Sequence, residues 1–382
     1  MKLSMKKILH LLLGLFVTLP AWALVGLPPA PPKVEARAWV LLDTSSGQVL
    51  AGQNQDQKLE PASLTKLMVA YLVFDAMKSG KIAADDTFTV SAKAAAAPGS
   101  RMFAKAGQEV KVDDLLMGMI VLSANDAALA LAEGLAGSEE SFVGRMNEQA
   151  KKLGLNSTQF RNAIGLAQPE HTSTASDLTR LANWLVYSFP EQYKRYFALR
   201  EFTFNGVTQQ NRNRLLWLDP QVDGIKTGHT QSAGYCLIAS AERGKRRLIA
   251  TVMGVRSDAD RGMYAQNLLN YGFLDTESLR YYRAGQAVAT IPVYKGSSRE
   301  VGIGFLRDFT LTTQKGVANR IKAQVITRQP FIAPLSKGQV MGTMRLTLDG
   351  QLVGDYPLVA LDDVPVAGFF GRLWDGLRLL FK

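Results

Sequence analysis

The spacing of apolar residues along the chain changes twice and predicts an α+β domain followed by an all-β domain. Apolar runs at 38–43 and around Val49, with a turn at 45–47, predict two strands near the start. Helical spacing then predicts five helices, over Leu64–Met77, Val112–Leu122, Asn125–Leu135, Phe142–Leu153 and Leu178–Tyr187. A period of two returns in a predicted hairpin, Tyr235–Ala241 with Arg247–Gly254. The last predicted helix of this domain, Arg261–Tyr271, follows the hairpin. Strands at both ends with helices between them indicate one antiparallel sheet flanked by helices.

Beyond Arg283 the helical spacing disappears and short alternating runs take its place. These runs are Val288–Tyr294, Phe309–Thr313, Ile321–Ile326, Val340–Leu348 and Leu352–Val359. Glycine-containing turns separate them, a pattern typical of a small β-sandwich. We therefore expect an α+β domain over residues 24–283 and an all-β domain over residues 284–362, to which we assign no chemistry.

Residues 1–23 have the features of a secretory signal peptide. Lys2, Lys6 and Lys7 precede an apolar run at 8–17, and Ala21-Trp22-Ala23 has the small-x-small form of a cleavage site. The run is shorter than the ~20 residues of a membrane-spanning helix, so cleavage after Ala23 is favoured over an uncleaved anchor. The protein is therefore predicted to be exported.

Residues 363–382 form an amphipathic segment. A helix beginning near Ala367 would place seven apolar residues on one face: Phe369, Phe370, Leu373, Trp374, Leu377, Leu380 and Phe381. The other face would carry Arg372, Asp375, Arg378 and Lys382. Such a segment is too short to span a bilayer and is typical of a helix lying in the headgroup layer of an anionic membrane. A terminal helix docked on the protein, or a dimer contact, is the alternative.

Composition narrows the class of protein and the partner. The chain has 382 residues, of which 47% are apolar, and a single Cys, which excludes disordered, collagen-like and disulfide-stapled chains. The formal charge is +11, and removing the three lysines of the signal peptide leaves 41 basic against 33 acidic residues, a net +8. Together with the amphipathic segment 363–382, this positive charge favours an anionic membrane over nucleic acid as the partner. Cys236 lies in an apolar run and is predicted to be a buried, inert thiol.

Ser63 and Lys66 are the first residues that suggest catalysis. Ser63-Leu64-Thr65-Lys66 opens the first predicted helix, which places both side chains on one face. A serine hydroxyl needs a base to become a nucleophile, an unprotonated lysine is such a base, and a helix start offers N–H groups to an oxyanion. The pattern alone is weak, because Ser4 and Lys7 share the spacing and Ser63 could be a helix cap.

Two further motifs strengthen this interpretation. Ser123-Ala124-Asn125 lies between two predicted helices, and Lys226-Thr227-Gly228 precedes a predicted strand. Each could be an ordinary cap or turn by itself. The order Ser-x-x-Lys, Ser-x-Asn, Lys-Thr-Gly, in these settings, indicates one active site.

With these motifs the chain resembles the low-molecular-mass penicillin-binding proteins of the 5/6 type, which are serine-type D-alanyl-D-alanine carboxypeptidases. The likeness covers nearly the whole chain and includes the segments 200–206, 211–213 and 222–225 and the extension His229-Thr230. It implies the penicillin-recognising serine transferase/β-lactamase-like fold and removal of the terminal D-Ala from peptidoglycan pentapeptide stems through an acyl-enzyme. It also implies covalent inhibition by β-lactams, no cofactor or metal, and a periplasmic protein attached through 365–382 to the outer face of the inner membrane.

The resemblance assigns a role to each motif residue. Ser63 would be the nucleophile, Lys66 its base, and Ser123 a proton relay toward the leaving amine. The implied substrate-binding residues are Asn125, Lys226, Thr227, Gly228, His229 and Arg261. Asn125 would bind the stem-peptide amide, Lys226 would supply positive charge, and Thr227 would bind the terminal carboxylate. The backbone N–H groups of Ser63 and His229 would form the oxyanion hole. Arg261 matches an arginine near that carboxylate, with a solvated surface arginine as the alternative.

A lysine base must have a lowered pKa. Free lysine has a pKa of about 10.4, so Lys66 would be protonated at neutral pH unless its surroundings lowered its pKa. Burial and the charge of Lys226 are expected to lower its pKa.

Three other functions remain open. A β-lactamase on the same fold often uses a Glu-x-x-Leu-Asn pattern, which 165–181 lacks although it contains Glu170. Spacing does not exclude a D,D-endopeptidase that cuts cross-links. A non-catalytic scaffold would have no need of the complete motif set, and a Ser-His-Asp triad is not expected from His171 or His229.

Overall fold

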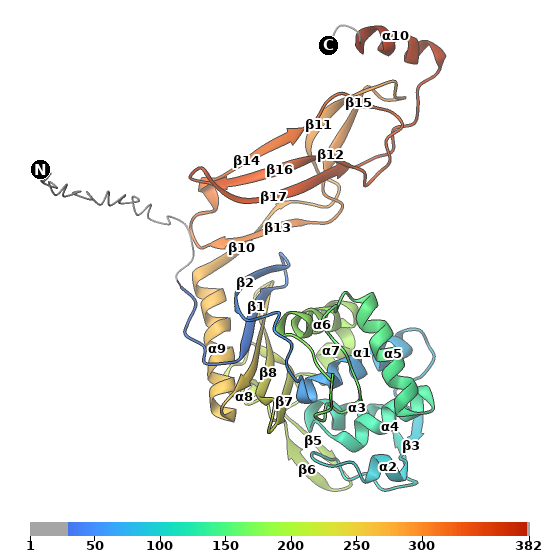
Figure 1. The fold of residues 1–382 in the computed structure, drawn as a ribbon, viewed down its shortest axis with the longest axis vertical. Coiled ribbons are helices and arrows are strands. Elements are labelled where there is room, and N and C mark those ends of the chain that lie inside the picture. The colour runs from blue at the N-terminus through green and yellow to red at the C-terminus, as the bar shows by residue number, and fades with distance from the viewer. Residues whose placement is uncertain (1–29, 380–382) are drawn as a thin grey trace, which may run out of the picture.

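The computed structural model describes residues 30–379. The predicted signal peptide and Leu380, Phe381 and Lys382 at the other end lie outside these described residues. The α+β domain, the β domain and a terminal helix follow one another along the long axis (Figure 1).

A five-stranded antiparallel sheet with the order β2-β1-β9-β8-β7 forms the centre of the first domain. Its strands are β1 (Ala38–Asp43), β2 (Gln48–Gln53), β7 (Val222–Thr230), β8 (Gly234–Arg243) and β9 (Arg246–Val255). Because β1 pairs with β9, both ends of the domain share the sheet, as predicted. β7 lies at the edge, where every second residue has backbone groups without a strand partner.

Helices cover both faces of this sheet (Figure 1). One side carries α1 (Lys66–Lys78), α2 (Ala92–Ala95), α3 (Val112–Val121), α4 (Asn125–Ala136), α5 (Glu139–Lys152), α6 (Ala175–Ser188) and α7 (Pro190–Tyr196). The other side carries α9 (Asp258–Asp275), with the short α8 (Leu215–Leu218) near its start. Alternate residues of β1 belong to separate cores on the two faces of the sheet. Val40 packs with the first group of helices, whereas Trp39 and Leu41 pack with α9.

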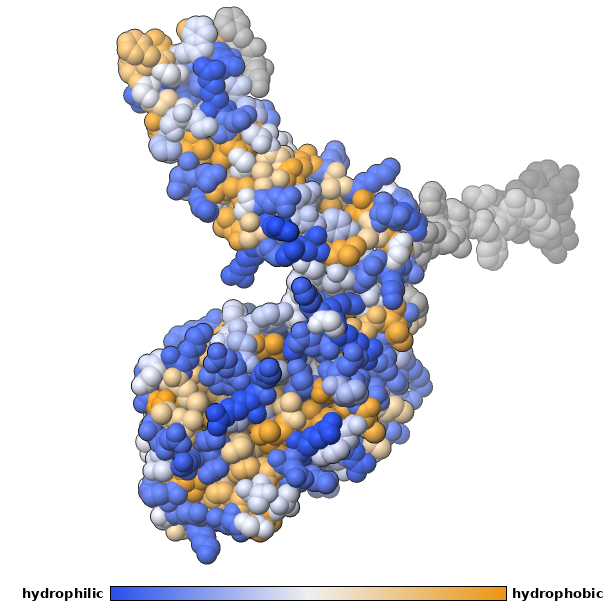
Figure 2. All heavy atoms as spheres, turned by 180° about the vertical axis from the view of Figure 1, so that it is seen from behind, coloured by the Kyte–Doolittle hydropathy of each residue, from blue (hydrophilic) through white to orange (hydrophobic). Residues whose placement is uncertain are grey.

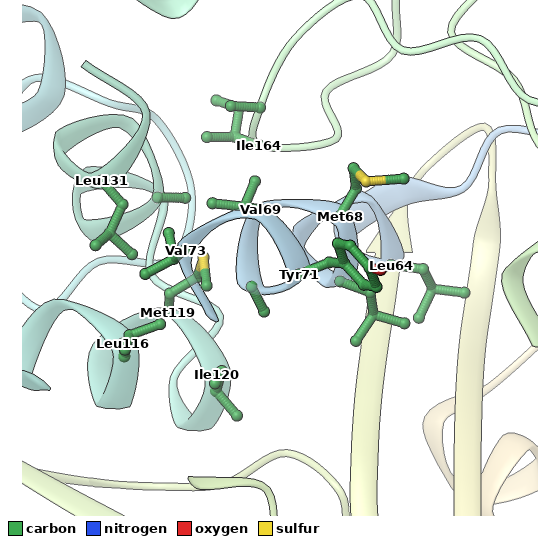
Figure 3. Close-up of a cluster of buried hydrophobic side chains, with 14 of the residues drawn as sticks. Leu64, Met68, Val69, Tyr71, Val73, Leu116, Met119, Ile120, Leu131 and Ile164 are labelled. Atoms are coloured by element: carbon green, nitrogen blue, oxygen red, sulfur yellow. The ribbon is translucent and has the colours of Figure 1, made fainter. Parts of the chain in front are cut away.

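α1 is apolar on nearly all sides because it runs through the middle of the larger core. Val73 on this helix lies beside Met119 of α3, and Val69 points toward Ile164 (Figure 3). A helix enclosed in this way holds its first turn rigidly, and Lys66 is the first residue of that turn. Cys236 is fully buried, as predicted, and burial raises the pKa of its thiol to about 11, which keeps it inert.

Two small two-stranded sheets in this domain are missing from the sequence prediction. They are β3 (Thr87–Thr89) with β4 (Glu109–Lys111), and β5 (Glu201–Phe204) with β6 (Val207–Gln210). Asn205 and Gly206 both have positive φ, so they form the tight turn that an Asn-Gly pair favours.

The second domain is a sandwich with its own core. Its strands are β10 (Thr276–Tyr282), β11 (Ala287–Tyr294), β12 (Glu300–Gly304), β13 (Phe309–Gln314), β14 (Ile321–Thr327), β15 (Phe331–Ile332), β16 (Val340–Leu348) and β17 (Gln351–Ala360), with a 3-10 turn η2 (Ala318–Arg320). A six-stranded sheet, β14-β16-β17-β12-β11-β15, packs against the β10-β13 pair. All five predicted runs are strands. β10 pairs with β13, so residues 276–282 belong with this domain and the boundary lies before the expected residue 284.

A buried carboxylate joins the two domains. Asp43, at the end of β1, lies 2.8 Å from Nε of Arg246 in the first domain. The same carboxylate accepts hydrogen bonds from Ser278 and Thr312 of the second domain, the latter at 3.1 Å. Ser46 and Gln48 of the first domain also form hydrogen bonds with Thr312, and beyond these contacts an open notch separates the domains (Figure 2). These polar contacts together orient the β domain.

The last element, α10 (Phe369–Leu379), is amphipathic as predicted. Asp375 accepts a hydrogen bond of 2.7 Å from the backbone N–H of Lys295, which ties the helix to the end of β11. Its apolar side chains point outward: Phe369, Phe370, Leu373, Trp374 and Leu377 are all exposed. Within residues 30–379, none of the helices has the length and apolar character needed to cross a bilayer.

Candidate active site

Ser63 lies on a short 3-10 turn, η1 (Ala62–Thr65), which leads directly into α1. The predicted helix start is therefore tighter than an α-helical turn. Side chains three residues apart eclipse in 3-10 geometry, and Lys66 Nζ lies 3.1 Å from Ser63 Oγ. The expected contact between hydroxyl and amine is present.

Lys66 is almost completely buried, and its amine has three partners. Nζ lies 2.6 Å from Oδ1 of Asn125 and 2.7 Å from the carbonyl oxygen of Ile164, both of which only accept hydrogen bonds. A neutral amine has two N–H donors and one lone pair. With both donors used, the lone pair faces the Ser63 hydroxyl, which is the arrangement that a general base requires.

Burial, together with the positive charge of Arg212, lowers the pKa of Lys66 to about 7, and Asp126 opposes the shift. The expectation of a lowered pKa is confirmed. The neighbouring charge that lowers it, however, is that of Arg212 and not that of Lys226. Burial also holds the pKa of Lys226 well below its usual value, with smaller contributions from Lys66 and Arg212. The charge of Lys66 thus disfavours the charged form of Lys226.

Asn125 begins α4 and is fixed by the loop before α3. Its Nδ2 donates to the carbonyl of Pro98 at 2.5 Å, and its backbone N–H donates to the carbonyl of Ser100 at 2.7 Å. These bonds orient Oδ1 toward Lys66. Asn125 therefore positions the base, and one Nδ2 hydrogen is left for a ligand.

Ser123 occupies the junction between α3 and α4 with a φ of +60°. A residue with a side chain rarely adopts this left-handed conformation, which costs of order 1–3 kcal/mol and is found chiefly at functional sites. Here it turns the chain sharply and leaves Ser123 facing the cavity described below.

Gly228 allows β7 to approach the serine turn. A Cβ on this residue would lie 3.2 Å from Cβ of Ala62, from the oxygen of Pro61 and from the backbone nitrogen of Ser63. Lys226 Nζ donates to the Thr227 carbonyl at 3.0 Å. The edge strand thus runs directly alongside the nucleophile.

A cavity of about 890 Å³ opens over Ser63. Five other predicted residues line it: Ser123, Thr227, Gly228, His229 and Arg261. Lys66, Asn125 and Lys226 are buried. All three motifs therefore come together around one hydroxyl.

Arg261 is a buried residue of α9, which rules out the alternative of a solvated surface arginine. Its Nη1 lies 3.2 Å from the carbonyl of Gly228 and 3.4 Å from that of Cys236. The guanidinium lies over the ring of Tyr235 at 5.4 Å from its centre, and its other edge pairs with Asp258.

Some residues of the site were not singled out from the sequence. Arg212 lines the cavity and acts on Lys66, and it could have been found within the family-like segment Asn211-Arg212-Asn213. Gly165 follows Ile164, and its Cβ would lie 1.9 Å from the oxygen of Ala62. Only glycine fits there.

His171 and Glu170 serve structural contacts away from the nucleophile. His171 lies 2.8 Å from the Thr65 hydroxyl and accepts from the backbone of Arg161, and burial lowers its pKa to about 4. Glu170 is exposed and pairs with Arg161. His229 packs on Tyr235. Residues 30–379 contain no group of three or more His, Cys, Asp or Glu side chains able to hold a metal.

A serine with a buried lysine base, in a cavity lined by three arginines, suits acyl transfer to a serine from a ligand that carries an anion. Together with the antiparallel sheet and its helices, this defines a serine hydrolase of the penicillin-recognising class. The profile of the D-alanyl-D-alanine carboxypeptidase family, Peptidase S11, matches residues 27–257, and that of the penicillin-binding protein 5 C-terminal domain matches residues 277–366. The chain belongs to this carboxypeptidase family and is of the low-molecular-mass penicillin-binding type.

Relatives and solved structures agree with this assignment. The chain is 43% identical over 358 residues to the D-alanyl-D-alanine carboxypeptidase DacC of Escherichia coli, covering 92% of this chain and 89% of the relative. Its fold is similar to that of penicillin binding protein 5 from Haemophilus influenzae, with a TM-score of 0.85, 38% identity and coverage of 88% and 99%. It is also similar to ampicillin-bound penicillin-binding protein D2 from Listeria monocytogenes, with a TM-score of 0.56, 33% identity and coverage of 64% and 99%.

Proposed function

We propose that this chain removes the terminal D-Ala from peptidoglycan pentapeptide stems through an acyl-enzyme on Ser63. The observation that carries the proposal is the amine of Lys66, which lies 3.1 Å from the hydroxyl while its other hydrogen bonds go to acceptors. In the first step Ser63 Oγ attacks the carbonyl of the penultimate D-Ala, and its proton passes to Lys66. The C–N bond then breaks, and the departing amine of D-Ala takes a proton through Ser123. Water later hydrolyses the ester and frees Ser63.

The oxyanion of the tetrahedral intermediate would be held by the backbone N–H groups of Ser63 and His229. The close approach of Gly228 to the Ser63 nitrogen supports this role, because it brings β7 next to η1. Donors fixed before reaction stabilise the developing charge more than the ground state, and one such donor contributes ~10²-fold or more in rate.

The free carboxylate of the substrate would bind where the cavity is most positive. Arg212 and Arg261 line this region together with the Thr227 hydroxyl. Asn125 would offer its remaining amide hydrogen to the stem peptide. Burial holds the pKa of Lys226 below its usual value, and an arriving carboxylate would favour its charged form. A β-lactam carries a carboxylate beside its reactive amide and would acylate Ser63 in the same way.

Incubation with a soluble pentapeptide ending in D-Ala-D-Ala tests the proposal. Mass analysis is expected to show a tetrapeptide and free D-Ala. A cross-linked dimer of stem peptides should be left intact in the same assay. Cleavage of the dimer without release of D-Ala would favour the endopeptidase alternative.

We also propose that the exported protein lies in the periplasm, with α10 on the anionic outer face of the inner membrane and the β domain as a spacer. Five exposed apolar side chains on an 11-residue helix support this proposal, and Figure 2 shows apolar surface at the α10 end of the molecule. Arg372 and Arg378 could contact lipid headgroups. The tie between Asp375 and Lys295 would fix the angle at which the molecule stands.

Deletion of residues 365–382 is expected to release the protein from membranes and leave its activity on soluble pentapeptide within about twofold. The reason is that α10 is remote from the cavity and contributes apolar surface to lipid rather than to the protein core. Flotation with vesicles of anionic phospholipid measures the loss. A truncated protein that still floats with the vesicles would contradict the proposed anchor.

A further inference from the structure

Asp258 places a negative charge in a cavity built for an anion. Of the described residues that line the cavity, Asp258 alone is acidic, whereas Arg212, Arg214 and Arg261 are basic. Its carboxylate lies between two of these arginines. One oxygen contacts Nη2 of Arg261, and the other lies 3.2 Å from Nε of Arg214, on the turn that leads into α8.

Arg261 does not depend on Asp258 for its orientation. Its Nη1 donates to the carbonyls of Gly228 and Cys236, which uses both hydrogens of that nitrogen. Its guanidinium rests on the ring of Tyr235, and its side chain is only 6% exposed. These contacts fix the group from two sides.

The edge of Arg261 that remains for a ligand consists of Nη2 and Nε. A carboxylate pairs most strongly with arginine when it accepts from two such donors side by side. Asp258 occupies Nη2, one of these two donors. A ligand carboxylate that accepts from both donors of this edge therefore competes with Asp258 for Nη2.

We propose that Asp258 is a built-in counter-ion that competes with the substrate carboxylate for Arg261 and thereby sets the affinity for carboxylate-terminated ligands. This proposal rests on the proposed function, in which that carboxylate binds at Arg261. Arg214 is the second partner. Its side chain is 71% exposed and lies outside the buried part of the site, so it can hold Asp258 after displacement and keep the acid paired. Asp258 and Arg214 are specificity-determining residues and take no part in the chemical step.

Substitutions of Asp258 and Arg214 are expected to change KM in opposite directions. Asp258→Asn removes the competing charge and is expected to lower KM for a pentapeptide with a free carboxylate about threefold to fivefold, the size of one partly exposed ion pair. kcat is expected to change by less than about twofold, and acylation by penicillin should become faster. Arg214→Gln leaves Asp258 with Arg261 as its remaining partner and is expected to raise KM by a similar factor.

The double variant gives the sharpest readout. In the Asp258→Asn background, Arg214→Gln is expected to have no further effect on KM, because Arg214 acts through Asp258. Asp260→Asn is the matched control, since it removes a charge from the same helical turn where Asp260 bonds to Ser257. KM in this control is expected to equal that of the wild type.

Each outcome decides the proposal. An unchanged or raised KM in Asp258→Asn would overturn it and make Asp258 an orienting partner of Arg261. Equal effects of Arg214→Gln with and without Asp258 would also overturn it. Failure of the proposed function looks different: the wild type would release no D-Ala. In that case a faster penicillin acylation in Asp258→Asn still supports the counter-ion, and an unchanged acylation rate rejects it.

Discussion

Replacing Ser63 by alanine is expected to abolish covalent labelling by a fluorescent penicillin and to lower D-Ala release by ~10⁴-fold or more. The acyl-enzyme forms through Oγ, and an alanine side chain at this position would offer no atom for the ester. The hydroxyl lies 3.1 Å from the amine of Lys66, which keeps its bonds to Asn125 and Ile164, so the loss removes little else from the fold. Labelling is measured on a denaturing gel and D-Ala release by mass spectrometry, and unchanged denaturant midpoints would show that folding is retained.

Ser100→Ala is the matched control for this variant. Ser100 lines the same cavity, while the three hydrogen bonds of Lys66 go to Ser63, Asn125 and Ile164. The Ser100 variant should be labelled at a rate close to that of the wild type. A labelled band in Ser63→Ala that survives denaturation would assign the nucleophile elsewhere and remove the basis of the proposed mechanism.

The residues that carry the chemistry could be predicted because each motif is a local pattern in a definite setting. Lys66 follows Ser63 by one tight helical turn, and this spacing alone puts the two side chains together. What completes the site comes from distant parts of the chain. The Ile164 carbonyl and the charge of Arg212 reach Lys66 only through tertiary packing. Spacing along the chain contains no signal for such contacts.

The fold shows the same division between local and long-range information. Buried helices and the hairpin of β8 and β9 were predictable, since their apolar spacing is repeated over two or more turns or pairs. β7 was missed, because Lys226-Thr227-Gly228 was expected to precede a strand and instead lies within one. β10 was missed because its pairing with β13 lies across the domain boundary and its residues are mostly half-exposed. The Asp43 contact between the domains joins residues more than 200 positions apart.

Acylation by penicillin is expected to lose rate below about pH 7, the value to which burial and Arg212 lower the pKa of Lys66. The sign follows from the chemistry: the base is neutral above this pKa and protonated below it, so the acid side of the profile should fall about tenfold per pH unit. Lys66→Met removes the base and is expected to lower the acylation rate by ~10³-fold at about pH 8 and to abolish this acid limb. Stopped-flow labelling at a series of pH values measures both effects.

A second variant separates a base from a merely structural lysine. Arg212→Gln removes a charge that disfavours protonated Lys66, so the acid limb should move to higher pH even if carboxylate binding weakens. Lys81→Met, on the exposed surface after α1, is the control and should leave the profile unchanged. If the limb stays in place in Arg212→Gln, or persists in Lys66→Met, the group that titrates is not Lys66. Ser63 would then require a different base, and the hydrogen bonds from Lys66 to Asn125 and Ile164 would serve only to close the core beneath the cavity.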